Sequence, residues 1–369
     1  MAKVYRDLTH LVNLAKEPSS EKRRELLRSV TDLFMEAPDS HSESEKDKFG
    51  DILGSVARDM EMEVRRALAQ RLSSVPNAPR NIILQLANDE IAVARPVLTN
   101  SVVLKDIDLV ALAKIQSQDH LQAVALRNTV SIAVSNALVA RGDDKVLANL
   151  AGNAGASLSR ESLETMVERA QTAEVLHAPL VGRHGLPPDL LNSMFFAVSS
   201  ELKRSIMQRM KDIEPSLIDD AIRLTEKRMK RAINVPDPDE LKAQAFMANL
   251  QKSGPVTESL LFTLAKQKRF TEVHIVLGKL AAVDMKTARR VFEEPSPEPL
   301  AILCRACRFD RQTFSTLVLC RENNADGVKT LEEAYDLLQI YDQVPVETAQ
   351  RVMRFWRLRQ GTGDSAAAA

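Results

Sequence analysis

The sequence is poor in aromatic residues, glycine and cysteine, and each shortage argues against a class of protein. Aromatic residues make up 4% of the 369 residues and glycine occurs 12 times, whereas strand-rich folds use many aromatic and β-branched residues with glycine-rich turns. Cys304, Cys307 and Cys320 are too few for a disulfide framework. Alanine, leucine, arginine, glutamate and glutamine dominate instead. Because these residues favour helices, the composition predicts an all-α fold.

Long apolar runs and an excess of charge of one sign are also missing. No stretch approaches the roughly eighteen apolar residues of a membrane-spanning helix, and the first seven residues lack the apolar run of a signal peptide. Fifty basic residues balance fifty acidic residues, which argues against a globally basic nucleic-acid-binding protein or a polybasic membrane protein. These features predict a soluble, cytoplasmic protein without a membrane span.

A repeated helix-pair pattern occupies the chain between Asp59 and Ala156. A shift of thirty positions places Asp59 on Asp89 and Leu68 on Leu98, and Leu86, Leu112 and Leu138 follow one another at steps of twenty-six. Helical units this short cannot bury an apolar face alone, so they must stack on their neighbours. The pattern therefore predicts an α-solenoid of short antiparallel helices. Five leucines are expected in its core: Leu68, Leu86, Leu98, Leu112 and Leu138.

The rest of the chain is expected to divide around this repeat block, which covers 59–180. Residues 1–58 carry three amphipathic helical stripes and are expected to cap the stack. Two glycines and a double proline mark 181–188 as a hinge. Residues 189–322 are expected to form a second, repeat-like helical domain. Closing helices in 323–360 and a disordered, small-residue tail in 361–369 complete the predicted organisation.

Several runs of sequence resemble one family of proteins. They are Ser131 to Asp143, Val146 to Ala156, Glu164 to Ala170 and Leu300 to Phe314. These runs are similar to an alphaproteobacterial family of domains of unknown function, and the resemblance spans roughly Asp59 to Arg321. Where the family usually has a proline before a Gly-Ala pair, this chain has Ala154. The resemblance implies a soluble protein of HEAT-like repeats and brings no catalytic residues.

The sequence contains few motifs that carry chemistry. It has no Walker loop, dinucleotide fingerprint, zinc-protease motif or nucleophile elbow, so the chain is expected to be no enzyme and to hold no cofactor. Cys304, Cys307 and Cys320 have spacings that occur in zinc sites. Leu300, Leu303, Cys304 and Cys307 also lie at i, i+3, i+4 and i+7, which is typical of the buried stripe of one helix, and this interpretation is preferred to a metal site.

The expected role is that of a non-catalytic scaffold or adaptor in bacterial regulation or signalling, binding a protein partner along the inner helices of the stack. Polar residues spaced along the repeats, and an Arg-Trp pair in the last helix, are the predicted binding residues: Arg66, Asn100, Arg127, Asn136, Arg354 and Trp356. The alternative is a protein that binds nucleic acid or a phosphorylated ligand through a basic helix. Its patch would consist of Arg223, Lys227, Arg228, Lys230 and Arg231. The sequence leaves the partner's identity and the oligomeric state open.

Overall fold

The protein is all-α in the part that the computed structural model describes, which comprises residues 20–229, 256–321 and 331–358. The chain divides into two compact units, Met1–His184 and Gly185–Ala369. This division falls within 181–188, the segment predicted as a hinge. No helix of the described residues is both long enough and apolar enough to cross a membrane. The predicted tail at 361–369 and the first amphipathic stripe, near Val4 to Ala15, lie outside the described residues.

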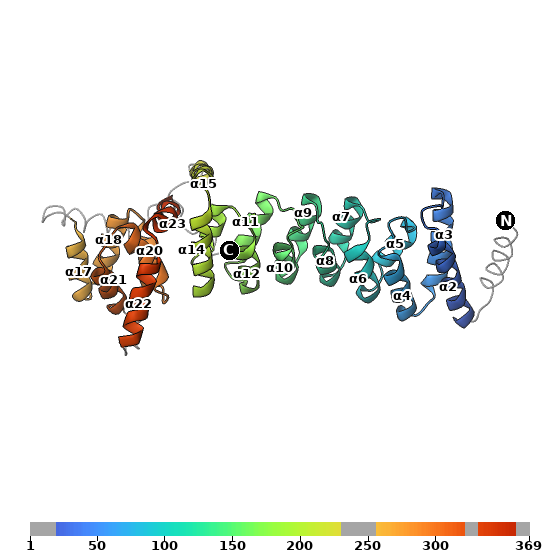
Figure 1. Cartoon of the computed structure of the whole chain (residues 1–369), viewed down its shortest axis with the longest axis horizontal. Coiled ribbons are helices and arrows are strands. Elements are labelled where there is room, and N and C mark those ends of the chain that lie inside the picture. The colour runs from blue at the N-terminus through green and yellow to red at the C-terminus, as the bar shows by residue number, and fades with distance from the viewer. Residues whose placement is uncertain (1–19, 230–255, 322–330, 359–369) are drawn as a thin grey trace. The chain divides into compact units, whose positions relative to one another are not determined.

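Short helices build the first unit (Figure 1). They are α2 (Ser20–Glu36), α3 (Glu43–Arg58), α4 (Met62–Leu72), α5 (Arg80–Ala87), α6 (Ile91–Asn100), α7 (Asp106–Ile115), α8 (Gln118–Ala125), α9 (Ile132–Arg141), α10 (Asp144–Gly152), α11 (Arg160–Arg169), the 3-10 helix η1 (Glu174–Leu176) and α12 (His177–Gly182).

The starts of these helices follow from local sequence. Ser42 and Glu45 form a capping box at the start of α3, in which each side chain accepts a hydrogen bond from the other residue's backbone N–H. Ser131, Asp143 and Ser159 cap α9, α10 and α11 in the same position. Because the first backbone N–H groups of a helix have no partner within it, such caps define where each helix begins.

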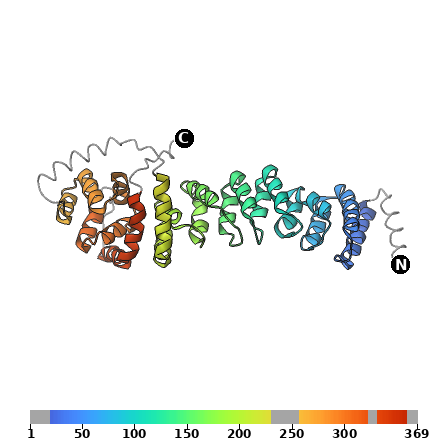
Figure 2. The same cartoon turned by 90° about the horizontal axis from the view of Figure 1, so that it is seen from above.

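Two rows of helices pack in the first unit. In one row α4 packs on α6, α6 on α8, α8 on α10 and α10 on α12. In the other, α3 packs on α5, α7 on α9 and α9 on α11. Figure 1 shows the row α4, α6, α8, α10 and α12 below the row α5, α7, α9 and α11, and Figure 2 shows the same helices following one another in chain order. From α3 to α10, every helix except α5 thus packs on the second helix after it.

The five leucines predicted to lie in the core are buried, as expected. Leu86, Leu98 and Leu138 are fully buried, and Leu68 and Leu112 are 3% and 4% exposed. They come from α4, α5, α6, α7 and α9, so both rows contribute to one continuous apolar layer. Removal of this apolar surface from water is the main term that stabilises such short helices.

The C-terminal ends of the helices are closed by side chains from the next helix of the same row. Arg127, after α8, donates to two carbonyl oxygens at the end of α6; Asn153, after α10, does so at the end of α8. Arg183, after α12, closes α10. In the other row Arg141 closes α7 and Arg169 closes α9. The last carbonyls of a helix lack partners within it and carry partial negative charge, so cations and amides stabilise them.

Two loops of the first unit also pair directly through their backbones. Val130 and Ala156 form an isolated parallel bridge, with Val130 N–H donating to the Gly155 carbonyl at 3.1 Å. A Cβ on Gly155 would lie 1.8 Å from the carbonyl oxygen of Asn128. Glycine is therefore required at position 155 by the close approach of the two loops. The run from Gly152 to Ser157 is the predicted turn between stacked helices.

The second unit is also built of helices. They are α13 (Pro188–Ser193), α14 (Ser200–Asp212), α15 (Pro215–Met229), α17 (Glu258–Lys266), α18 (Phe270–Ala281), α19 (Met285–Glu293), α20 (Glu298–Ala306), α21 (Arg311–Leu319), α22 (Leu331–Gln343) and α23 (Val346–Leu358).

Helix α20 is the central element of this unit. It packs on α19, α21, α22 and α23, and eight of its residues, including Leu300, Leu303 and Cys304, are buried. A helix that is apolar on all sides is expected at such a position. The sequence from Asp189 to Met210 predicts one continuous helix, and the structure corrects this, because α13 and α14 are separate. Met194 to Ser199 form turns between α13 and α14, and Phe195 in these turns is buried. The sequence also predicts a helix from Pro238 to Gln251, and this stretch lies outside the described residues.

Candidate functional site: a groove between helices α2 and α4

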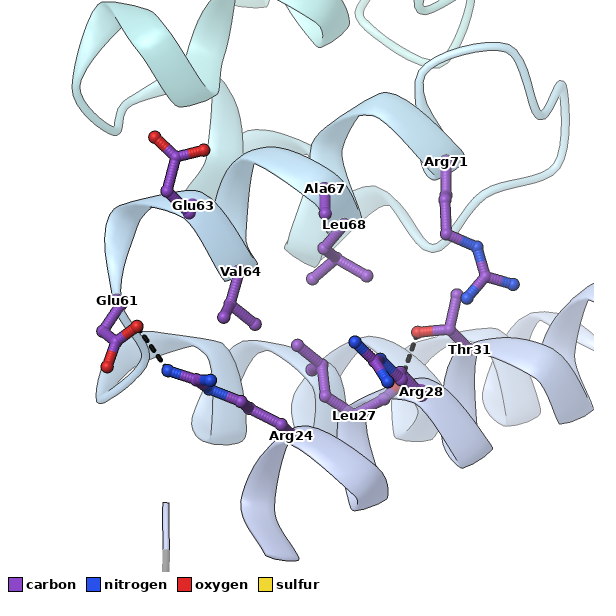
Figure 3. A pocket seen from close by; sticks show the side chains of 10 residues that line it. All are labelled: Arg24, Leu27, Arg28, Thr31, Glu61, Glu63, Val64, Ala67, Leu68 and Arg71. Atoms are coloured by element: carbon purple, nitrogen blue, oxygen red, sulfur yellow. Dashed lines mark hydrogen bonds and ion pairs between the residues drawn. The ribbon is translucent and has the colours of Figure 1, made fainter. Parts of the chain in front are cut away.

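A groove of about 270 Å³ lies between α2 and α4 of the first unit (Figure 3). Helix α2 packs closely on α3, and it meets α4 mainly through side chains. Both helices contribute residues at the spacing i, i+3, i+4 and i+7, which is one helical face. From α2 these are Arg24, Leu27, Arg28 and Thr31, and from α4 they are Val64, Ala67, Leu68 and Arg71.

The floor of the groove is apolar. Leu27 and Leu68 are 4% and 3% exposed, Val64 is half-buried and Ala67 is exposed. Thr31 is buried, and its hydroxyl donates to the Leu27 carbonyl at 2.6 Å, so it offers little polarity to the groove. An aliphatic side chain of a bound segment would therefore find apolar surface between the two helices.

Ion pairs join the two helices at both ends of the groove. Arg24 pairs with Glu61 at one end, as Figure 3 shows, and Arg71 pairs with Asp32 at 2.5 Å at the other. These pairs are largely exposed, so each contributes little to stability, on the order of 0–1 kcal/mol. The two pairs thus join α2 to α4 at the two ends of the groove.

Arg28 differs from the other two arginines of the groove. Its side chain is exposed and projects into the space between the helices in Figure 3, and it has no acidic partner among the residues that the structure describes. Glu63, the further carboxylate at the rim, points away from Arg28 in the same view. A guanidinium above an apolar floor can bind a carboxylate through two parallel N–H···O bonds while neighbouring side chains are desolvated. This arrangement favours a segment that combines an acidic residue with apolar ones.

The predicted binding residues do not form one surface. Arg66, on α4, and Asn100, on α6, are exposed and belong to the same row of helices. Asn136 is exposed on α9, in the other row, and its side-chain oxygen accepts hydrogen bonds from Ser159 and Ser162 at 3.0 and 2.7 Å. The expectation of a single ladder containing Asn136 is therefore corrected, since this amide links α9 to α11.

Arg127 is also corrected, because its side chain is 9% exposed and serves the interior. Its two terminal nitrogens donate to the carbonyls of Leu98 and Ser101 at 2.6 and 2.8 Å. Burial lowers the pKa of this guanidinium from its usual value. The residue follows α8, where the sequence alone does not reveal that the end of another helix lies within reach.

Of the C-terminal pair, Trp356 lies in the core and Arg354 lies at the surface. Trp356 is 1% exposed and packs against Phe195 and Phe196, with ring centroids 5.7 and 5.1 Å away. Arg354 is exposed and pairs with Asp219 at 2.6 Å. The prediction that Trp356 presents its ring to a partner is thus wrong for this state of the chain. An Arg-Trp pair on an amphipathic helix suits both roles, and only packing distinguishes them.

The alternative basic patch is described only in part. Arg223 on α15 is exposed and lies 3.7 Å from Asp220. Nothing is described for the side chains of Lys227 and Arg228, and Lys230 and Arg231 lie outside the described residues. The patch therefore stays a prediction.

Cys304 on α20 is fully buried, which agrees with the interpretation of the cysteines as part of the buried stripe of one helix. Cys307 and Cys320 are half-buried. Burial raises the pKa of the Cys304 thiol well above its usual value and raises the pKa of Cys307 to about 11. Both thiols are consequently protonated near neutral pH and are poor nucleophiles. The described residues contain no group of three or more His, Cys, Asp or Glu side chains able to share a metal ion.

The groove between α2 and α4 was not predicted from the sequence. Its signal is present, since Arg24, Leu27, Arg28 and Thr31 alternate charge and apolar surface on one helical face. Such a mixed stripe on an isolated helix is equally typical of a core face with arginines at its border. The position of α4 opposite this stripe shows that the stripe lines a groove.

A comparison with protein families finds one match, to a model described as "Uncharacterised protein conserved in bacteria (DUF2336)", over residues 93–354. No curated protein and no solved structure matches the chain. The matched stretch begins within α6 and ends within α23, later at both ends than the resemblance from Asp59 to Arg321. The groove between α2 and α4 precedes it. Since the match covers more than half of the 369 residues, the chain belongs to the DUF2336 family of uncharacterised proteins conserved in bacteria.

Proposed function

We propose that this protein is a non-catalytic scaffold that binds a protein partner, built as an α-solenoid of HEAT-like repeats in its first unit. The packing of α4, α6, α8, α10 and α12 on one another in sequence supports this architecture, as do the side chains that close one helix from the next helix of the same row. Stacked helix pairs of this kind offer extended surfaces whose side chains recur at regular spacing.

The single observation that carries the proposal is the groove between α2 and α4. It combines an apolar floor at Leu27 and Leu68 with Arg28, a cation without an acidic partner in the described structure. Interface centres typically join buried apolar contacts to one well-placed arginine. The adjoining exposed face of α4, with Arg66, can extend the contact beyond the groove.

Site-specific photo-crosslinking in the producing bacterium tests this function. A photoreactive residue at Ala67, which lines the groove, is expected to give a covalent adduct of defined mass with another protein, and Arg28→Glu is expected to reduce it several-fold. Two controls are available: the same photoreactive residue at Ala133, exposed on α9, and Arg58→Glu, a charge reversal on α3 outside the groove. Equal adducts at both sites, or an adduct at Ala67 that persists in the Arg28 variant, would contradict the proposal.

The alternative function is the binding of nucleic acid or a phosphorylated ligand through α15. Measuring the binding affinity at increasing salt concentration distinguishes it from protein binding. Contacts to phosphates give an affinity that falls steeply with salt concentration. Three arginines of α23 that could have enlarged such a basic surface have internal acceptors instead. Arg351 donates to the end of α14, Arg354 pairs with Asp219 and Arg357 donates to the Ala281 carbonyl.

A further inference from the structure

A second groove, in the Gly185–Ala369 unit, lies between α14, α20 and the α22–α23 turn. Its volume is about 250 Å³. Arg204 and Lys211 line it from α14, with Met207 between them. Ile340, which is half-buried, adds apolar surface from α22, and the buried side chains of Ile302 and Val344 lie beneath it. The groove is thus an apolar trough with two cations along one wall.

Both cations are exposed, and neither has an acidic partner among the described residues. Three other cations of this unit have partners within the protein. Lys203, the residue next to Arg204, pairs with Glu294 at 2.5 Å, and Arg305 donates to the Val344 carbonyl at 2.8 Å. Arg351 donates to three carbonyls at the end of α14. The two cations of the trough are therefore left available where adjacent cations are satisfied internally.

The carboxylate that also lines the trough is engaged within the protein. Glu298 is 8% exposed and accepts a hydrogen bond from the Ser296 hydroxyl. Its charge is therefore directed toward the interior of the unit, and the exposed charge of the trough is positive. An occupant that matches this surface carries negative charge beside apolar groups.

We propose that this trough binds an acidic amphipathic helix of a partner protein. Arg204 and Lys211 are seven residues apart on α14, which corresponds to two helical turns and about 10.5 Å along the axis. A helix lying along α14 with carboxylates at i and i+7 has the same separation. Leucines at i+3 and i+4 of that helix would then face Met207 and Ile340, which are both half-buried. Recognition of an amphipathic helix by an apolar groove with charged borders uses this kind of spacing.

The test is fluorescence anisotropy of the full chain with a labelled helical peptide of about 15 residues, near the length at which isolated helices become stable. The peptide carries glutamates at i and i+7 and leucines between them. Binding is expected, and Arg204→Glu and Lys211→Glu are each expected to weaken it at least about fivefold, the effect of losing roughly 1 kcal/mol. A twin peptide with lysines in place of the glutamates is expected to recover affinity for the double variant.

Lys279→Glu is the matched control. Lys279 is also an exposed lysine in the last turn of its helix, α18, so the reversal has the same effect on the helix dipole, but it lies outside the trough. Circular dichroism checks that every variant keeps its helices. The proposal is overturned if Lys279→Glu weakens binding as much as Lys211→Glu does. It is equally overturned if serines replace the peptide's leucines without loss, or if a single-stranded DNA oligonucleotide binds the same residues more tightly, which would assign the trough to phosphates.

Discussion

At the scale of single residues, the surroundings of a side chain decide whether its polarity serves binding or stability. Arg28 and Arg127 both carry a guanidinium group. Arg28 projects into the groove between α2 and α4, whereas Arg127 donates hydrogen bonds to carbonyls in the interior. His274 and Trp356 are also placed inside, at 6% and 1% exposure. Their side chains are consequently expected to affect the free energy of unfolding more than partner binding.

His274 is expected to make the second unit less stable in acid. Burial against Phe292 lowers the pKa of its imidazole below the usual value near 6.5. The unfolded chain therefore binds the proton at a higher pH than the folded chain does. The stability contributed by neutral His274 is present above about pH 6.5 and is lost as the pH falls toward the folded pKa.

Urea unfolding at several pH values between about 7 and 5 checks this expectation. His274→Leu should flatten the pH dependence of the unfolding free energy of the second unit, because it removes the imidazole whose pKa is lowered by burial. An identical pH dependence in wild type and His274→Leu would show that another group is responsible.

Trp356→Ala is expected to destabilise the second unit by about 3–5 kcal/mol, because it removes a large buried ring from between Phe195 and Phe196. Trp356→Phe keeps most of the apolar volume and should cost clearly less. Chemical denaturation followed by circular dichroism measures both. If Trp356→Ala keeps full stability and loses a binding partner, the ring belongs to an interface after all.

At the scale of elements, the helices of the first unit are too short to be stable alone, and their ends depend on one another. The end of α6 is closed from the residue after α8, and the end of α8 from the residue after α10. Each cap satisfies carbonyls that would otherwise be buried without partners. Packing and capping therefore link the same pairs of helices.

Arg127→Ala is expected to lower the free energy of unfolding of the first unit by about 1.5–3 kcal/mol, the usual contribution of hydrogen bonds to a charged group. Arg127→Lys should recover only part of this, since an ammonium cannot reproduce the two-pronged geometry toward Leu98 and Ser101. Arg66→Ala, at an exposed position of α4, should change stability by less than about 0.5 kcal/mol. Equal effects of the Arg66 and Arg127 substitutions in thermal unfolding would exclude the capping role.

At the scale of the whole molecule, the chain forms two compact units that divide between His184 and Gly185. The family match extends across this division, from residue 93 to 354. Each unit has its own buried core, with Leu98 and Leu138 in the first and Leu300 and Phe314 in the second. A separate core in each unit is the basis for independent folding.

The fragment 1–184 is accordingly expected to fold alone and to unfold cooperatively at nearly the same denaturant concentration as in the full chain. Circular dichroism and urea titration of the fragment measure this, with Leu98→Ala in the fragment as the control. That variant should lose about 2–5 kcal/mol if the isolated core is native-like. A fragment that lacks helical content, or one that is insensitive to Leu98→Ala, would show that the first unit depends on the second.

The sequence by itself determined the helices and the core of the repeats. Capping residues such as Ser42 and Ser131, and leucines such as Leu86 and Leu138, act through neighbours a few positions away, so their spacing is sufficient to place them. The family was also recognisable from local runs of sequence.

The tertiary structure alone decided which polar side chains are available. Arg127 and Trp356 looked like surface residues because nothing in their own helices shows that the end of α6 or the ring of Phe196 lies beside them. Arg28 became a candidate only when α4 was placed opposite α2. These contacts join residues 26 or more positions apart, and the free energy of such contacts depends on the packing of whole helices rather than on local pattern.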